Sequence, residues 1–172
     1  MKKAIALSET EQRDLDDALF LHVRDGNLSE VRKAVKAGAN LKATLYLSPI
    51  LNVAFMRVKP SKRLINYLLD KGADINAVDY DSRSALHWAA LRGSHAIIEV
   101  LIERGANLLA QNKLQMTPLE ATQTFSGADQ KTINLLINAE NKAKTKKELG
   151  VLKTVAGIDQ KEEIVLPHAK TL

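Results

Sequence analysis

The chain has no cysteine, few aromatic residues and no long apolar run. Without cysteine it can form neither a disulfide framework nor a thiolate metal site. Aromatic residues make up only 4% of the 172 residues, which gives little support for stacking on nucleic-acid bases. No apolar run approaches the ~20 residues that cross a bilayer, so we expect no membrane span. The apolar share of 45% is ordinary for a folded protein, and the length predicts one domain.

Sequence motifs for catalysis are also missing. The histidines have no carboxylate at a metal-ligand or triad-like spacing, and there is no phosphate-binding glycine loop or nucleophile elbow. Asp14, Asp16 and Asp17 lie close together, but acidic residues in the N-terminal half of a helix stabilise its dipole. We therefore interpret them as local stabilisation, and expect no enzyme activity, no metal and no cofactor.

What the chain does have is a repeat. Two apolar residues, two polar residues and Gly-Ala recur around Gly38, Gly72 and Gly105, and a degraded copy ends at Ala139. The intervals are 34, 33 and 34 residues. Such a period is typical of a stack of small helical units, in which each unit buries its apolar face against its neighbours.

The segment 79–90, DYDSRSALHWAA, carries another motif of the repeat unit. It resembles the ankyrin-repeat signature D-x-x-G-x-T-P-L-H-x-A-A, and the resemblance covers roughly residues 14–140. It implies an all-α solenoid of helix-turn-helix units joined by β-turn or hairpin loops. It also implies structural roles for His87, which bridges turn backbones, and for His95, which lies near the loop between the two helices.

The period divides the chain into an array and a tail. We predict an ankyrin array over 1–140, with repeats at about 14–42, 43–76, 77–109 and 110–140. A basic capping helix and tail over 141–172 follows, in which Gly150 and Gly157 separate short pieces. Thr117-Pro118 starts the fourth inner helix, with proline in the first turn. Ser8 and Glu11 predict a capping box at the start of the first helix.

The net charge of +5 comes largely from the tail. We interpret its lysines as a solvated helix that caps the array; contact with nucleic acid or an anionic membrane is the alternative. The N-terminal apolar run is too short for a signal peptide, so we expect a cytoplasmic protein. Export to the periplasm or a host cell is the alternative if a longer leader has been removed.

In ankyrin arrays the partner usually meets the turn tips and the exposed side of the inner helices. Transferred to this chain by position, these sites are unusually apolar, and exposed apolar residues mark binding surfaces. Trp88 is included although its position is commonly used for packing. The predicted partner-binding residues are Leu45, Tyr46, Leu47, Phe55, Met56, Tyr80, Asp81, Arg83, Trp88, Leu91, Arg92, Lys113, Leu114, Met116 and Phe125.

The resemblance therefore implies a protein-binding module. We expect a small, monomeric protein of bacterial character that binds one protein partner on its concave face, which the turn tips and inner helices line. We expect it to regulate or inhibit a partner enzyme by covering the active site. The second hypothesis is a scaffold that touches nucleic acid or an anionic membrane through the basic tail. Nucleic acid is the less favoured partner, because no groove-reading motif is present.

Overall fold

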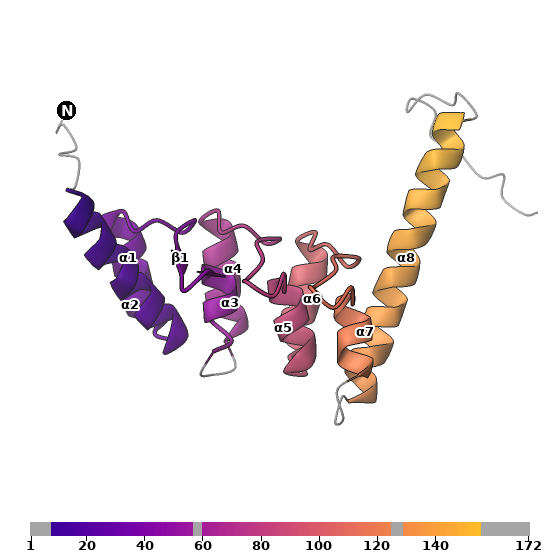
Figure 1. Ribbon diagram of the computed structural model, residues 1–172, viewed down its shortest axis with the longest axis horizontal. Coiled ribbons are helices and arrows are strands. Elements are labelled where there is room, and N and C mark those ends of the chain that lie inside the picture. The colour runs from indigo at the N-terminus through magenta and orange to yellow at the C-terminus, as the bar shows by residue number, and fades with distance from the viewer. Residues whose placement is uncertain (1–7, 57–59, 125–128, 156–172) are drawn as a thin grey trace, which may run out of the picture.

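The computed structural model describes residues 8–56, 60–124 and 129–155. Over these residues the chain forms an elongated stack of helix pairs (Figure 1). The pairs are α1 (Glu9–Arg24) with α2 (Leu28–Ala37), α3 (Ile50–Val53) with α4 (Lys62–Asp70), α5 (Ala85–Leu91) with α6 (His95–Glu103), and α7 (Pro118–Gln123) with α8 (Gln130–Val155). The helix-turn-helix fold predicted from the repeat is confirmed.

The stack has an inner and an outer row of helices. In the inner row α1 packs on α3, α3 on α5 and α5 on α7, and in the outer row α4 packs on α6 and α6 on α8. Strands β1 (Thr44–Leu45) and β2 (Ser48–Pro49) form a small antiparallel hairpin before α3. One apolar core runs along the stack. Its largest buried side chains are Phe20, Phe55, Leu19, Ile50, Leu51, Leu64, Ile65, Leu68, Leu86, Ile98, Leu101 and Leu136.

The helix starts follow the predicted capping chemistry. Ser8 Oγ accepts a hydrogen bond from the backbone N–H of Glu11, and Glu11 Oε2 accepts one from the Ser8 backbone N–H. Thr117 and Glu120 form the same box at α7, with Pro118 in the first turn. These bonds satisfy N–H groups that the first helical turn leaves unpaired. Both predicted helix starts are confirmed.

Three outer helices end at a glycine, and the fourth does not. Gly38, Gly72 and Gly105 have φ values of 105°, 90° and 85°, which side chains other than glycine's rarely adopt. Ala139 occupies the corresponding place in the last repeat. Alanine favours continued helix, and α8 runs without a break from Gln130 to Val155.

Helix α8 thus crosses the predicted boundary between array and tail at residues 140–141, and the break predicted at Gly150 is wrong, because Gly150 lies inside α8. At 26 residues α8 is about 39 Å long. Its C-terminal half extends beyond the side of the stack along which the hairpin and the loops lie (Figure 1). The predicted separation at Gly157 lies outside the described residues.

Polar bonds attach α8 to the two preceding helices. Asp129 accepts hydrogen bonds from the Thr132 backbone N–H, the Thr132 hydroxyl and His95 Nε2. Glu140 is buried, and its carboxylate accepts from Thr117 Oγ1 and from Lys144 Nζ. These bonds hold α8, the second helix of the last pair, against α6 and α7.

Candidate protein-binding surface

Three loops precede the inner helices α3, α5 and α7, and we call residues 43–47, 79–83 and 112–116 the tip loops. Each contains a non-glycine residue with positive φ at the same place: Tyr46 at 49°, Ser82 at 60° and Gln115 at 58°. This is the glycine position of the repeat signature, and a side chain there costs about 1–2 kcal/mol. The chain therefore carries a side chain at each tip where glycine would fit without strain.

The first tip loop is built differently from the other two. In the second and third loops, Asp79 and Asn112 each accept two backbone N–H bonds through Oδ1, which holds the turn closed. Ala43 takes their place in the first loop and has no acceptor. There the β1–β2 hairpin closes the loop, and Leu47 also has positive φ, at 59°, as in a type I′ turn.

Large apolar side chains lie exposed at the tips. The exposed fractions are 86% for Tyr46, 69% for Leu47, 58% for Tyr80 and 71% for Leu114. A hydrogen bond from the Lys113 backbone N–H to the Asp81 carbonyl joins the second and third loops, and the Lys113 ammonium lies over the Tyr80 ring. The tips therefore present apolar surface to solvent from loops whose backbones are held in place.

Phe55 corrects the predicted set. It was expected at an exposed position after α3, but its side chain is only 1% exposed and belongs to the core. Helix α3 is short, and the turn that follows keeps a helical hydrogen bond from Phe55 N–H to the Asn52 carbonyl. Phe55 therefore lies four residues beyond Leu51 on the same buried face.

Arg83 contacts Asp79 and Asp81 of the second tip loop and Trp88 of α5. The Arg83 guanidinium pairs with Asp79 and Asp81 and lies over the Trp88 ring. Trp88 Nε1 donates to Asp79 Oδ2. We missed Asp79 in the sequence, although a buried acid at the start of a turn is a usual acceptor for backbone N–H groups. This cluster shapes the loop.

The other predicted residues vary in accessibility. Met56, Arg92 and Lys113 are exposed, while Leu45, Leu91 and Met116 are half-buried. Phe125 lies outside the described residues. The exposed members of the predicted set are thus concentrated in the tip loops, and fewer lie along the inner helices.

His87 connects neighbouring repeats, as the resemblance implied. Its Nδ1 accepts from the Ser84 backbone N–H, so Nε2 carries the proton and donates to the Met116 carbonyl at 3.2 Å. Burial lowers the pKa of His87, and the bond to the Met116 carbonyl opposes that effect only in part. His87 is neutral near pH 7 and links the second tip loop to the third. His95 instead bonds to Asp129, across the repeat boundary.

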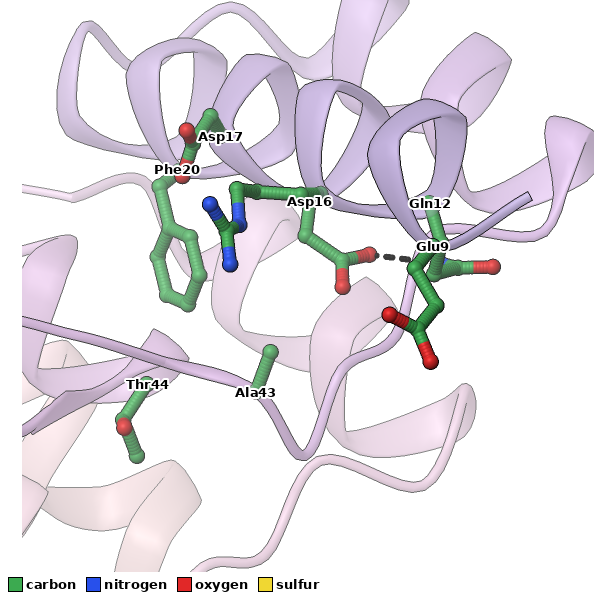
Figure 2. A pocket seen from close by; sticks show the side chains of 8 residues that line it. Glu9, Gln12, Asp16, Asp17, Phe20, Ala43 and Thr44 are labelled. Atoms are coloured by element: carbon green, nitrogen blue, oxygen red, sulfur yellow. Dashed lines mark hydrogen bonds between the residues drawn. The ribbon is translucent and has the colours of Figure 1, made fainter. Parts of the chain in front are cut away.

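A hollow of about 460 Å³ lies between α1 and the first tip loop. Figure 2 shows Glu9, Asp16 and Asp17 of α1 on one side and Thr44 on the other. Asp16 accepts from Gln12 Nε2 and from the Asn40 backbone N–H, so it attaches α1 to the loop after α2. The hollow itself was not predicted, because nothing in the sequence places residues 43–44 across from α1.

A model of the ankyrin-repeat family (many copies) matches residues 51–102. Residues 51–102 of this chain therefore carry ankyrin repeats. Human inversin is 42% identical over 55 residues, which cover 32% of this chain and 5% of inversin. Rat protein fem-1 homolog A is 33% identical over 104 residues, or 58% of this chain and 16% of that protein. The potassium channel SKOR of Arabidopsis thaliana is 35% identical over 83 residues, 48% of this chain and 10% of the channel.

The matched part of the ankyrin chain is therefore a small part of each of these relatives, from 5% to 16% of their length. Ankyrin repeats generally mediate protein–protein interaction and are typically not enzymes. Within residues 8–56, 60–124 and 129–155, no group of histidines and carboxylates is arranged to hold a metal ion. Over the same residues, every helix is too short or too polar to cross a bilayer.

Proposed function

We propose that this ankyrin chain binds a partner protein through its three tip loops and has no catalytic activity of its own. The observation that carries the proposal is the exposure of Tyr46, Leu47, Tyr80 and Leu114 on three consecutive loops. Exposed apolar side chains grouped in this way lower the solubility of a protein unless another surface covers them. Tyrosine is also enriched at protein interfaces.

The backbone conformation of the tips supports the same proposal. Glycine at Tyr46, Ser82 and Gln115 would relieve the positive-φ strain, yet none of the three positions has it. Strain of this kind is found where a side chain serves binding rather than stability. The hydrogen bonds of Asp79 and Asn112 hold two of the loops in place, so binding need not order them.

We further propose that binding regulates or inhibits a partner enzyme by covering its active site. The stack is stiff because each inner helix packs on the next, and its loops form a row along one side of the stack. A row of this kind can cover a cleft without entering it. No chemistry by this chain is needed for such inhibition.

The test is capture of the partner from a lysate of the source cells on immobilised protein. We compare wild type with a Tyr46→Ser/Leu47→Ser/Leu114→Ser variant, and use Leu21→Ser as the control, since Leu21 is 45% exposed on α1 outside the tip loops. A protein captured by wild type and the control but not by the triple variant supports the proposal. Equal capture by all three contradicts it. If the captured protein is an enzyme, its rate with and without the chain tests inhibition.

A second function has its own observation in its favour. Lys142 and Lys146 are exposed on α8. These lysines support the alternative of a contact with nucleic acid or an anionic membrane. Phosphate contacts weaken steeply with added salt, whereas apolar contacts at the tips do not. Binding that is lost at high salt and is insensitive to the triple variant favours the alternative.

A further inference from the structure

The first tip loop stands between two hollows. Ala43 and Thr44 line both the 460 Å³ hollow beside α1 and a second one of about 290 Å³ on the opposite side of the strand. The second hollow is largely apolar and reaches Pro49, Ile50 and Val78. The exposed Tyr46 and Leu47 form the turn of the same hairpin. A segment that packs on this turn therefore has a recess on either side for a neighbouring side chain.

The charge of the two hollows differs. The hollow beside α1 is lined by the carboxylates of Glu9, Asp16 and Asp17 and by one guanidinium, that of Arg13. Among the described residues, the side-chain carboxylates of Glu9 and Asp17 form no hydrogen bond or ion pair, although their backbones belong to helix α1. Two carboxylates in a recess favour a cation and disfavour phosphate, so this end of the surface selects by charge.

We propose that the first tip loop docks a partner protein segment in which a lysine or arginine adjoins an apolar residue. The cation enters the hollow beside α1, near Glu9 and Asp17, and the apolar residue packs on Tyr46 and Leu47. This inference rests on the proposed function and adds the chemistry of the segment that is recognised. In this inference the polar part of the contact is made by α1, the inner helix of the first, terminal repeat.

The probe is a set of random peptides displayed on phage and selected on the full chain. We expect the selected peptides to be enriched in lysine or arginine next to an apolar residue. A peptide from this set is then measured by fluorescence anisotropy against three variants. Glu9→Gln/Asp17→Asn should weaken binding about fivefold or more. Glu99→Gln/Glu103→Gln, with the same charge change on exposed residues of α6, should leave it unchanged. Tyr46→Ser/Leu47→Ser should abolish it.

Each other outcome contradicts the inference in a recognisable way. If Tyr46→Ser/Leu47→Ser abolishes binding but Glu9→Gln/Asp17→Asn does not weaken it, the tips bind and the basic residue does not enter the hollow. If no variant weakens binding, or no peptide is selected, the proposed function at this loop fails as well. Circular dichroism and a melting curve for each variant exclude loss of fold as the cause.

Two further measurements test whether the hairpin or the hollow is covered by something other than a partner segment. Sedimentation equilibrium of wild type and of Tyr46→Ser/Leu47→Ser shows whether a second copy of the chain covers the hairpin. A dimer that the variant converts to monomer overturns the inference. Removal of residues 156–172 shows whether this segment occupies the hollow; a gain in peptide affinity on removal also overturns it.

Discussion

Trp88 donates its indole N–H to the Asp79 carboxylate across 2.9 Å, and this bond attaches the inner helix α5 to the second tip loop. Asp79 is buried and also accepts from the backbone N–H groups of Asp81 and Arg83. The Arg83 guanidinium lies over the Trp88 ring. The shape of the loop is thus determined by a residue outside the predicted binding set.

Asp79→Ala should destabilise the protein by about 2–3 kcal/mol, because several donors lose one shared buried acceptor. Trp88→Phe removes one donor only and should cost about 1 kcal/mol. Urea unfolding followed by circular dichroism measures both. Asp74→Ala is the matched control, since Asp74 is exposed and accepts a single backbone bond, from Asn76. Equal destabilisation by Asp79→Ala and the control would contradict the role given to Asp79.

His87 should make stability depend on pH. Its folded-state pKa is lowered from 6.5 by burial, so the unfolded chain binds a proton more readily. The stabilisation is therefore fully present above pH 6.5 and is lost as the pH falls from there through the folded-state pKa. His87→Gln should be less stable at pH 7.5, and the stability lost between pH 7.5 and 5 should be smaller than for wild type. Unfolding curves across this range give the comparison; identical pH profiles would refute it.

Tyr46→Gly should stabilise the free protein and weaken partner binding. Glycine adopts positive φ without the cost of about 1 kcal/mol that tyrosine incurs, and Tyr46 is too exposed to contribute much packing. The melting temperature and the affinity for a selected peptide are the two measurements. Ser82→Gly is the control at the corresponding place of the second loop. A loss of stability in Tyr46→Gly would show that the ring has a structural contact.

Ala139→Gly should loosen the second half of α8. Glycine inside a helix costs about 1 kcal/mol relative to alanine, and in this repeat it restores the residue that ends the other outer helices. Hydrogen exchange over 140–155 should become faster, while α6 keeps its protection. Asn138→Gly serves as the control, because Asn138 is exposed and lies beside the repeat position, not on it. Unchanged exchange in Ala139→Gly would mean that bonds such as Glu140 to Thr117 suffice to hold the helix.

Some features followed from local chemistry and were predicted from the sequence. The period of the glycines predicted the stacked pairs, and Ser8 with Glu11 and Thr117 with Pro118 predicted two helix starts. The loop positions with large apolar residues were also predicted, because the repeat signature gives each residue a place. Their exposure at Tyr46, Leu47, Tyr80 and Leu114 agrees with that placement. Their role in binding stays a prediction.

Other features depended on contacts between distant residues. The burial of Phe55, the continuation of α8 through Gly150 and the pairing of Arg83 with Asp79 and Asp81 were not predicted. The burial of Phe55 and the pairing of Arg83 depend on which residues the fold places beside them. The continuation of α8 depends on packing that favours helix over a break at Gly150. The hollow beside α1 exists only because residues 43–44 return to it after α2.

The sequence by itself determined the repeat, its period and the residues that begin and end most helices, because these depend on neighbours within one turn of helix or one loop. The tertiary structure decided which apolar residues remain exposed and where charge gathers. Side-chain burial depends on packing between repeats, and a hollow needs two walls that are distant in sequence. In this chain those walls are α1, with Glu9 and Asp17, and the first tip loop, with Thr44.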